Sequence, residues 1–152
     1  MSTTGDRSVG EASQAGIEAL TAAPPPDRDG YVATLLEARR KIGSPGFPFD
    51  EERSRQIARR SFDRGFHPKG TVRQTIAIIL SGDRTERLAG IKVPTVVIHG
   101  EEDPLIGVSG GRATAAAIPG SKLVLIPGMG HDFPAGIWER VAGEILANAQ
   151  RA

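Results

Sequence analysis

Two polar segments near the end of the chain contain the residues whose types and spacing could perform chemistry. Asp103 lies in the segment 99–105 (HGEEDPL), and His131 lies in the segment 127–132 (PGMGHD). Each segment follows a short apolar run typical of a buried strand, so both side chains would lie at the carboxyl edge of a parallel sheet. A carboxylate at that edge can fix the tautomer of an imidazole and stabilise it when it takes a proton. The two residues therefore fit the orienting acid and the general base of a hydrolase.

The spacing of Asp103 and His131 leaves a second interpretation open. Asp often accepts hydrogen bonds from the backbone of the turn that follows it, and a loop histidine can be an ordinary polar residue. In that case Asp103 only caps the turn after its strand, and His131 has no chemical role.

The last third of the chain predicts an alternation of strands and helices. The β-branched, continuously apolar runs 94–100 (PTVVIHG) and 122–127 (KLVLIP) predict two parallel strands buried on both faces. The alanine-rich stretch 110–118 between them predicts a helix. From Ile137 onward, one helical face carries Trp138, Val141, Ala142, Ile145 and Leu146, which predicts a packing helix. The fold class is therefore α/β.

The first ninety residues instead predict helices joined by loops. The prolines 24–26 end a short helix over 11–20. Further helices are expected from an N-cap at Asp29 to Gly43, from Asp50 onward, and from Pro68 to Gly82, the last with the strongest amphipathic pattern. The spacing of Asp83 and Glu86 fits a capping box that opens a short helix ending near Leu88.

The segments 93–105 (VPTVVIHGEEDPL), 119–120 (PG) and 125–131 (LIPGMGH) closely resemble the C-terminal part of α/β-hydrolase-fold enzymes. The residues around these segments are similar to those of the esterase branch that contains aclacinomycin methylesterases and haloperoxidase-like hydrolases. The stretch 60–83 resembles the end of that branch's helical cap. The resemblance implies an incomplete α/β-hydrolase fold: residues 1–10 as the exit of a core strand, 11–90 as a helical cap region with a return helix, and 91–152 as the C-terminal core with two strands.

In this family the acid and the histidine at these positions complete a Ser-Asp-His triad, so the resemblance implies catalytic roles for Asp103 and His131. The nucleophilic serine precedes both in chain order, and no strand, Gly-x-Ser-x-Gly turn and helix precede Asp103. We therefore expect the C-terminal portion of a serine hydrolase acting on small-molecule carboxylic esters, without its nucleophile and starting at an internal methionine. The alternative is a catalytically inert truncated fragment or interaction module.

Other polar and aromatic residues have simpler interpretations. Residues 107–111 (GVSGG) match Gly-x-Ser-x-Gly by letter, but Ser109 follows Asp103 and is expected to be a helix N-cap. His99 is expected to be a hydrogen-bonded structural histidine and His67 an exposed one. Asp132 adjoins His131, so its side chain should point elsewhere. Four phenylalanines fit either an acyl pocket or, as we prefer, the core of the cap: Phe47, Phe49, Phe62 and Phe66.

Composition excludes several classes of function. With 19 basic and 18 acidic residues and only 5% aromatics, the chain has no basic or base-stacking surface that predicts nucleic-acid binding. It has no cysteine, and its three histidines are scattered, so no metal site is expected. No cofactor is expected either, because the chain has no nucleotide-binding pattern and the haloperoxidase-like branch that it resembles implies metal-free enzymes. No apolar run reaches membrane-spanning length and no signal-peptide pattern is present, which predicts a cytoplasmic protein without membrane contacts. The open sheet edge predicts self-association.

Overall fold

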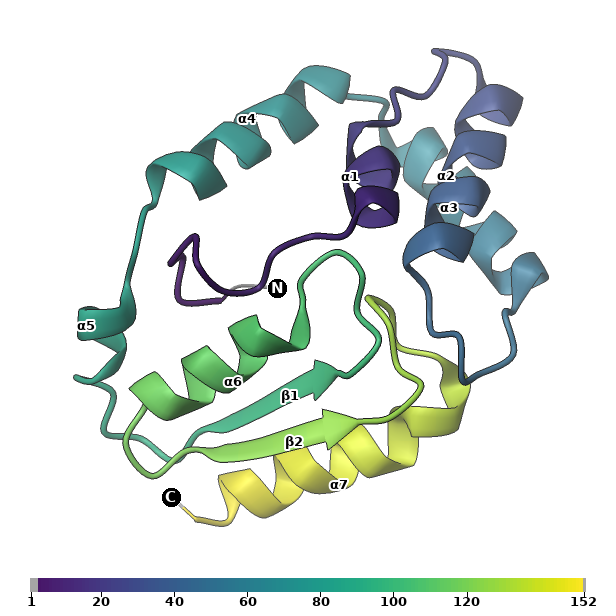
Figure 1. The fold of residues 1–152 in the computed structure, drawn as a ribbon. Coiled ribbons are helices and arrows are strands. Elements are labelled where there is room, and N and C mark those ends of the chain that lie inside the picture. The colour runs from purple at the N-terminus through teal and green to yellow at the C-terminus, as the bar shows by residue number, and fades with distance from the viewer. Residues whose placement is uncertain (1–2, 152) are drawn as a thin grey trace.

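The computed structural model describes residues 3–151 and contains a parallel pair of strands (Figure 1). Strand β1 (Val96–Gly100) pairs with β2 (Lys122–Ile126) in a register that places Val96 opposite Lys122 and Gly100 opposite Ile126. Both predicted strands are therefore present and parallel. Their carboxyl ends meet at one edge, which brings the segments containing Asp103 and His131 together.

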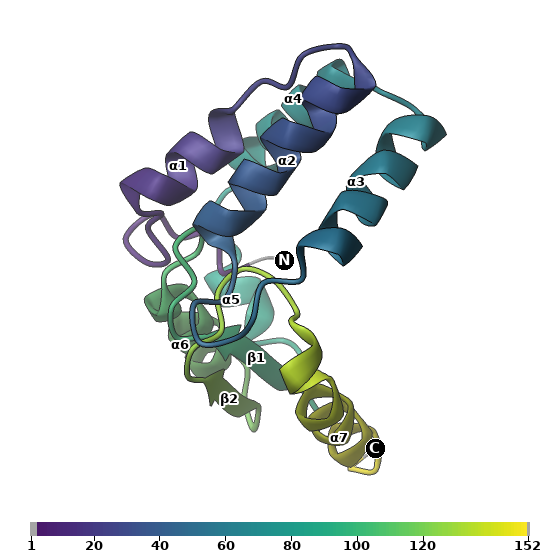
Figure 2. The same cartoon turned by 90° about the vertical axis from the view of Figure 1, so that its right-hand side faces the viewer.

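Two helices cover the small sheet. Helix α6 (Val108–Ala117) connects the strands, and α7 (Trp138–Ala149) follows a short 3-10 turn, η1 (Ala135–Ile137). Figures 1 and 2 show the sheet lying between α6 and α7. The main apolar cluster lies here and consists of Val124, Ile126, Met129 and Ile137, packed against Phe47, Val96, Ile98 and Val141.

The strands are less buried than their sequences predict. Val96 to His99 of β1 are only half-buried, and the side chains of β2 alternate between buried and partly exposed. The expectation of strands buried on both faces was therefore wrong, because each strand of a two-stranded sheet is also an edge strand. Helix α7 likewise leaves Trp138, Ile145 and Leu146 of its predicted packing face exposed.

Three helices of the helical region, residues 11–90, pack together above the sheet (Figure 2). They are α1 (Gln14–Thr21), α2 (Arg28–Ile42) and α3 (Glu51–Arg64), and a small core of Val32, Leu36 and Ala58 lies between α2 and α3. Helix α2 begins after Asp27 rather than at the predicted Asp29. The Asp27 carboxylate accepts the Gly30 N–H at 2.8 Å, and Asp29 instead lies in the first turn.

Helices α4 (Pro68–Leu80) and α5 (Thr85–Leu88) run from α3 back toward the sheet. Helix α4 has the strongest amphipathic pattern in the sequence of this region, yet none of its residues is buried, and Val72, Ile76, Ile78, Ile79 and Leu80 are exposed. The predicted capping box starts one residue too early. Arg84, not Asp83, is the N-cap of α5, although the Asp83 carboxylate still accepts the Thr85 N–H at 2.9 Å.

The segment before α1 lies against the starts of α5 and α6. The Arg84 N–H donates to the Thr4 carbonyl at 2.7 Å, and the Gly10 N–H donates to Ser109 Oγ at 2.9 Å. Residues 3–10 form turns and irregular structure, and residues 1–2 lie outside the described residues. The interpretation of 1–10 as the exit of a core strand stays a prediction. None of the described helices is long and apolar enough to cross a membrane.

Candidate active site

Asp103 lies in the tight turn that follows β1. Its Oδ1 accepts the N–H groups of Leu105 and Ile106, both at 2.9 Å, so this carboxylate does cap the turn. The residue is buried, with 7% of its surface exposed. These two bonds fix the side chain and leave Oδ2 directed elsewhere.

His131 lies beside that second oxygen. The distance from His131 Nδ1 to Asp103 Oδ2 is 2.8 Å. Because a carboxylate is an acceptor, the contact places the proton on Nδ1 and leaves Nε2 as the nitrogen with a free lone pair. No hydrogen bond to Nε2 occurs within residues 3–151, so this nitrogen is available to a further group.

The surroundings of Asp103 favour its charged form. Burial by itself would raise the pKa of this carboxyl group. The hydrogen bond from His131, the two backbone N–H groups and the electrostatic attraction of His131 outweigh burial and hold the pKa below its ordinary value of 3.8. Asp103 is therefore an anion at neutral pH, as an orienting partner of histidine requires.

The loop between α2 and α3 holds the segment that carries His131. The His131 N–H donates to the Ile42 carbonyl at 2.7 Å, and the Gly130 N–H donates to Ser44 Oγ at 2.9 Å. The Ser44 hydroxyl in turn donates to the Asp132 carboxylate. No local sequence pattern marks Ser44, because its partners Gly130 and Asp132 lie more than eighty positions away in the chain.

Two glycines make this contact between the loops possible. Gly128 has φ +73°, a left-handed conformation that glycine adopts without strain. A Cβ atom on Gly130 would lie 2.1 Å from the Gly43 carbonyl oxygen, so no side chain fits there. Both belong to the sequence GMGH, and their absence of side chains lets the backbone approach the helical region.

A cavity of about 820 Å³ adjoins His131 between the helical region and the segment that follows β2. Helices α2 and α3 each contribute one face, and the segment 131–136 together with Trp138 forms the opposite wall. Phe47 and Phe49, from the loop between α2 and α3, also line it. A small organic molecule in this space would lie against the imidazole.

The other polar residues discussed in the sequence lie apart from the pair of Asp103 and His131 or make different contacts. Ser109 was expected to be the N-cap of α6, but the N-cap is Gly107 and Ser109 lies inside the helix. The Ser109 Oγ accepts the Gly10 N–H, and the residue does not line the cavity beside His131. His99 Nε2 contacts the Ile106 carbonyl at 2.8 Å, which confirms a hydrogen-bonded structural histidine. His67 is exposed, as predicted. Asp132 points toward Ser44, which confirms that it is not the partner of His131.

The four phenylalanines divide between the two roles considered for them. Phe62 and Phe66 form an aromatic cluster with Tyr31, with ring centroids 5.5 to 5.8 Å apart, in keeping with a core of the helical region. Phe47 and Phe49 instead line the cavity beside His131. The preferred assignment of all four to the core was therefore only half right.

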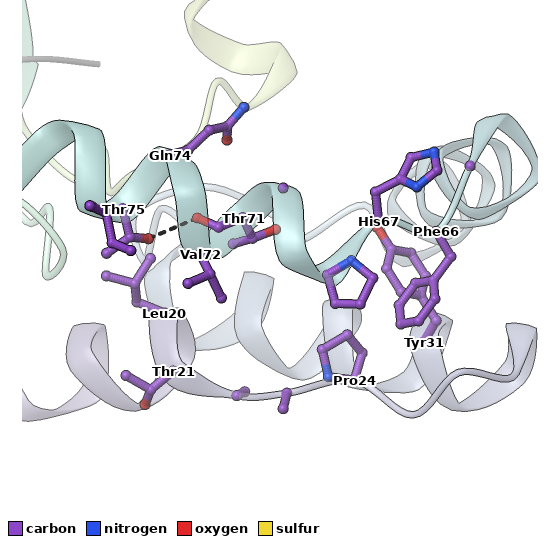
Figure 3. Close-up of a pocket in the computed structure, with 16 residues that line it drawn as sticks. Leu20, Thr21, Pro24, Tyr31, Phe66, His67, Thr71, Val72, Gln74 and Thr75 are labelled. Carbon is purple, nitrogen blue, oxygen red and sulfur yellow. Dashed lines mark hydrogen bonds between the residues drawn. The ribbon is translucent and has the colours of Figure 1, made fainter.

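A second cavity, of about 650 Å³, lies between α4 and the connection from α1 to α2 (Figure 3). Figure 3 shows Leu20 lying near Val72 and Thr75 of α4, and the His67 ring pointing away from Pro24. Neither Asp103 nor His131 lines this cavity, so it is separate from the candidate site. Among the described residues, no group of three or more His, Cys, Asp or Glu side chains is arranged to hold a metal ion.

Comparisons with known proteins connect this geometry to a family. No protein-family model matches the chain. A bifunctional esterase/perhydrolase from Acinetobacter calcoaceticus is 33% identical over 66 residues, which cover 43% of this chain and 24% of the relative. Rhodomycin D methylesterase DauP from Streptomyces sp. (strain C5) is 31% identical over 126 residues, which cover 78% of this chain and 41% of the relative. The chain thus spans less than half the length of these curated relatives.

Solved structures show the same fold. A meta-cleavage product hydrolase from Pseudomonas fluorescens IP01 superposes with a TM-score of 0.66 over 94% of this chain and 52% of that one, at 14% identity. Identity this low supports the fold alone. The curated relatives and the shared architecture agree with the resemblance noted from the sequence. The chain therefore belongs to the α/β-hydrolase fold superfamily and corresponds to about half the length of its members.

Proposed function

We propose that this chain supplies the acid and the histidine of a serine hydrolase that cleaves small-molecule carboxylic esters. His131 acts as general base and then as general acid, and Asp103 orients it. The 2.8 Å contact between His131 Nδ1 and Asp103 Oδ2, beside a cavity, is the observation that carries the proposal. The esterase names of the curated relatives support the choice of ester hydrolysis.

The proposed roles follow from the direction of the hydrogen bond. With Nδ1–H bound to Asp103, Nε2 accepts the proton of a serine hydroxyl as that oxygen attacks the ester carbonyl. The same proton then passes to the departing alkoxide, which leaves as an alcohol and gives an acyl-serine. His131 next takes a proton from water as the water oxygen attacks the acyl-serine. The bond to the serine oxygen then breaks, the carboxylic acid is released, and His131 returns the proton to the serine oxygen. The nucleophilic serine in this scheme comes from a segment other than residues 1–152.

A complementation experiment tests the whole proposal. The chain is co-expressed with the part of the Streptomyces methylesterase that has no counterpart in this chain, and hydrolysis of 4-nitrophenyl acetate is measured on the purified complex. We expect activity that His131→Ala abolishes and Asp103→Asn lowers by about 10⁴-fold, since a misplaced tautomer cannot act as base. A stable complex without His131-dependent hydrolysis contradicts the proposal and favours an inert chain.

A spectroscopic experiment tests the acid–histidine pair in the chain alone. A proton shared between imidazole Nδ1 and a buried carboxylate resonates far downfield in the proton NMR spectrum. We expect one such signal, absent from both Asp103→Asn and His131→Ala. Asp132→Asn is the matched control, because Asp132 adjoins His131 in sequence but binds Ser44, and this variant should keep the signal.

A further inference from the structure

The cavity beside His131 is lined by two arginines that form no ion pair with a carboxylate of the described residues. Arg39 comes from α2 and Arg53 from α3. Throughout residues 3–151, neither guanidinium takes part in an ion pair. Two neighbouring arginines on the same helices do form ion pairs, since Arg40 and Arg55 both pair with Glu51.

The helical spacing explains why both arginines face this cavity. The positions of α2 that line it are Leu35, Ala38, Arg39 and Ile42. The equivalent positions at α3 are Asp50, Arg53, Ser54 and Ile57. Both sets follow the spacing i, i+3, i+4, i+7, which defines one face of a helix. Each helix therefore places one arginine along the lining of the same cavity.

The two carboxylates that line the cavity, Asp50 and Asp132, accept hydrogen bonds from groups other than the arginine side chains. Asp50 accepts the backbone N–H of Arg53 at 2.9 Å and caps α3. Asp132 accepts the Ser44 hydroxyl. Neither contact involves a guanidinium, so the two arginines remain available to an anion that enters the cavity.

Aromatic walls accompany the two cations. The Arg53 guanidinium lies over the Trp138 ring, 4.7 Å from its centroid, a cation–π contact. A stacked guanidinium keeps its in-plane N–H donors free for a carboxylate. Phe47 and Phe49 add apolar surface to the same cavity. Such a site suits a molecule that combines a hydrocarbon part with a carboxylate.

We propose that this cavity selects esters that carry a second, free carboxylate. Arg39 and Arg53 recognise the anion, and the aromatic side chains contact the hydrocarbon part between the carboxylate and the ester. The ester part of this inference rests on the proposed function, because His131 would meet the ester group. The carboxylate selectivity depends only on the cavity.

Trp138 provides a direct measurement, since it is the only tryptophan of the chain and lines the cavity. The full chain is titrated with monomethyl glutarate and, separately, with its uncharged amide counterpart methyl glutaramate, and tryptophan fluorescence is recorded. The two probes have nearly the same size and differ in charge. We expect the anionic ester to bind about tenfold more tightly than the amide, because hydrogen bonds between ions are the stronger class.

Substitutions then assign the selectivity to the two arginines. Arg39→Gln and Arg53→Gln should each weaken binding of monomethyl glutarate by about three- to tenfold and leave binding of the amide unchanged. Arg60→Gln is the matched control, because Arg60 lies on α3, is exposed and does not line the cavity. Circular dichroism verifies that each variant is folded, and Arg39→Lys, which keeps the charge, should retain part of the selectivity.

The outcomes separate this inference from the proposed function. Equal affinity for the two probes, or no binding of either, overturns the carboxylate selectivity whatever the complementation experiment gives. An equal effect of Arg60→Gln and Arg39→Gln also overturns it, because general surface charge would then explain the binding. Selective binding in a chain whose complex hydrolyses no ester supports the carboxylate site and contradicts the hydrolase.

Discussion

At the scale of single residues, Asp103 performs two tasks at once. Oδ1 caps the turn after β1, and Oδ2 binds His131. The sequence left open whether Asp103 caps its turn or binds His131. The structure contains both contacts, one on each oxygen of the carboxylate. A turn held in this way keeps the acceptor of His131 in a fixed position, which is the condition for a single imidazole tautomer.

The lowered pKa of Asp103 predicts a specific dependence of stability on pH. In the folded state this carboxyl group has a pKa below 3.8, its value in the unfolded chain, so the unfolded state binds more protons near that range. Its contribution to the free energy of unfolding is fully present above the unfolded pKa and is lost as the pH falls through the folded pKa. Asp103→Asn should abolish that contribution.

Urea unfolding of the two proteins between pH 7 and pH 2 checks this expectation. The difference in unfolding free energy between wild type and Asp103→Asn should be largest at neutral pH and should shrink as the pH falls below about 4. A difference that stays constant over this range would show that the hydrogen bonds of Asp103, not its charge, stabilise the fold.

At the scale of elements, the loop between α2 and α3 and the segment after β2 form one unit. Ser44 accepts the Gly130 N–H and donates to Asp132, and Ile42 accepts the His131 N–H. Because these bonds join the helical region to the strand edge, the position of His131 depends on both. The cavity beside it is formed by the same junction.

Ser44→Ala should loosen this junction. The variant removes two hydrogen bonds of a half-buried hydroxyl, which should cost about 1 to 2 kcal/mol of unfolding free energy. Hydrogen exchange of the Gly130 amide, measured by NMR, should become faster. Ser121→Ala is the control, since it removes a side-chain bond to the Ala115 carbonyl outside the junction and should leave Gly130 exchange unchanged.

Gly130→Ala should be more damaging than Ser44→Ala. Its methyl group would overlap the Gly43 carbonyl oxygen, a backbone atom that cannot rotate away, so we expect a loss above about 2 kcal/mol. Gly143→Ala in α7 would place its new methyl group in open space and should stabilise the helix by about 0.5 to 1 kcal/mol. Thermal unfolding of both variants compares them, and equal effects would contradict the contact at Gly130.

At the scale of the whole molecule, burial is concentrated in two small clusters. One lies at the sheet and the other between α2 and α3. Helix α4 contributes to neither, although its sequence is apolar. Stability should therefore depend strongly on a few positions, while self-association through the open sheet edge stays a prediction.

Ile126→Ala and Ile79→Ser test this distribution. Ile126 is 1% exposed, so its truncation should lower the unfolding free energy by about 2 to 5 kcal/mol. Ile79 on α4 is 57% exposed, and its replacement by a polar residue should change the value by less than about 0.5 kcal/mol. Urea unfolding measures both. A large loss for Ile79→Ser would show that α4 is packed in solution.

The features that could be predicted from the sequence are those with local causes. Apolar runs specify β1 and β2, Asp50 marks the start of α3, and Pro68 marks the start of α4. The parallel order of the strands then brings the segments of Asp103 and His131 to one edge. Local patterns can still be ambiguous. Asp27 and Asp29 are both suitable N-cap residues, and it is Asp27 that caps α2.

The other features depend on contacts between distant parts of the chain. Ser44 binds Gly130, Ser109 binds Gly10, and Arg39 and Arg53 share one cavity only because helices and loops pack in a particular way. The exposure of α4 is of the same kind, since an amphipathic pattern says which face could be buried but not whether a partner surface lies there. Local periodicity and capping act within a few residues, whereas burial and site assembly are properties of tertiary packing.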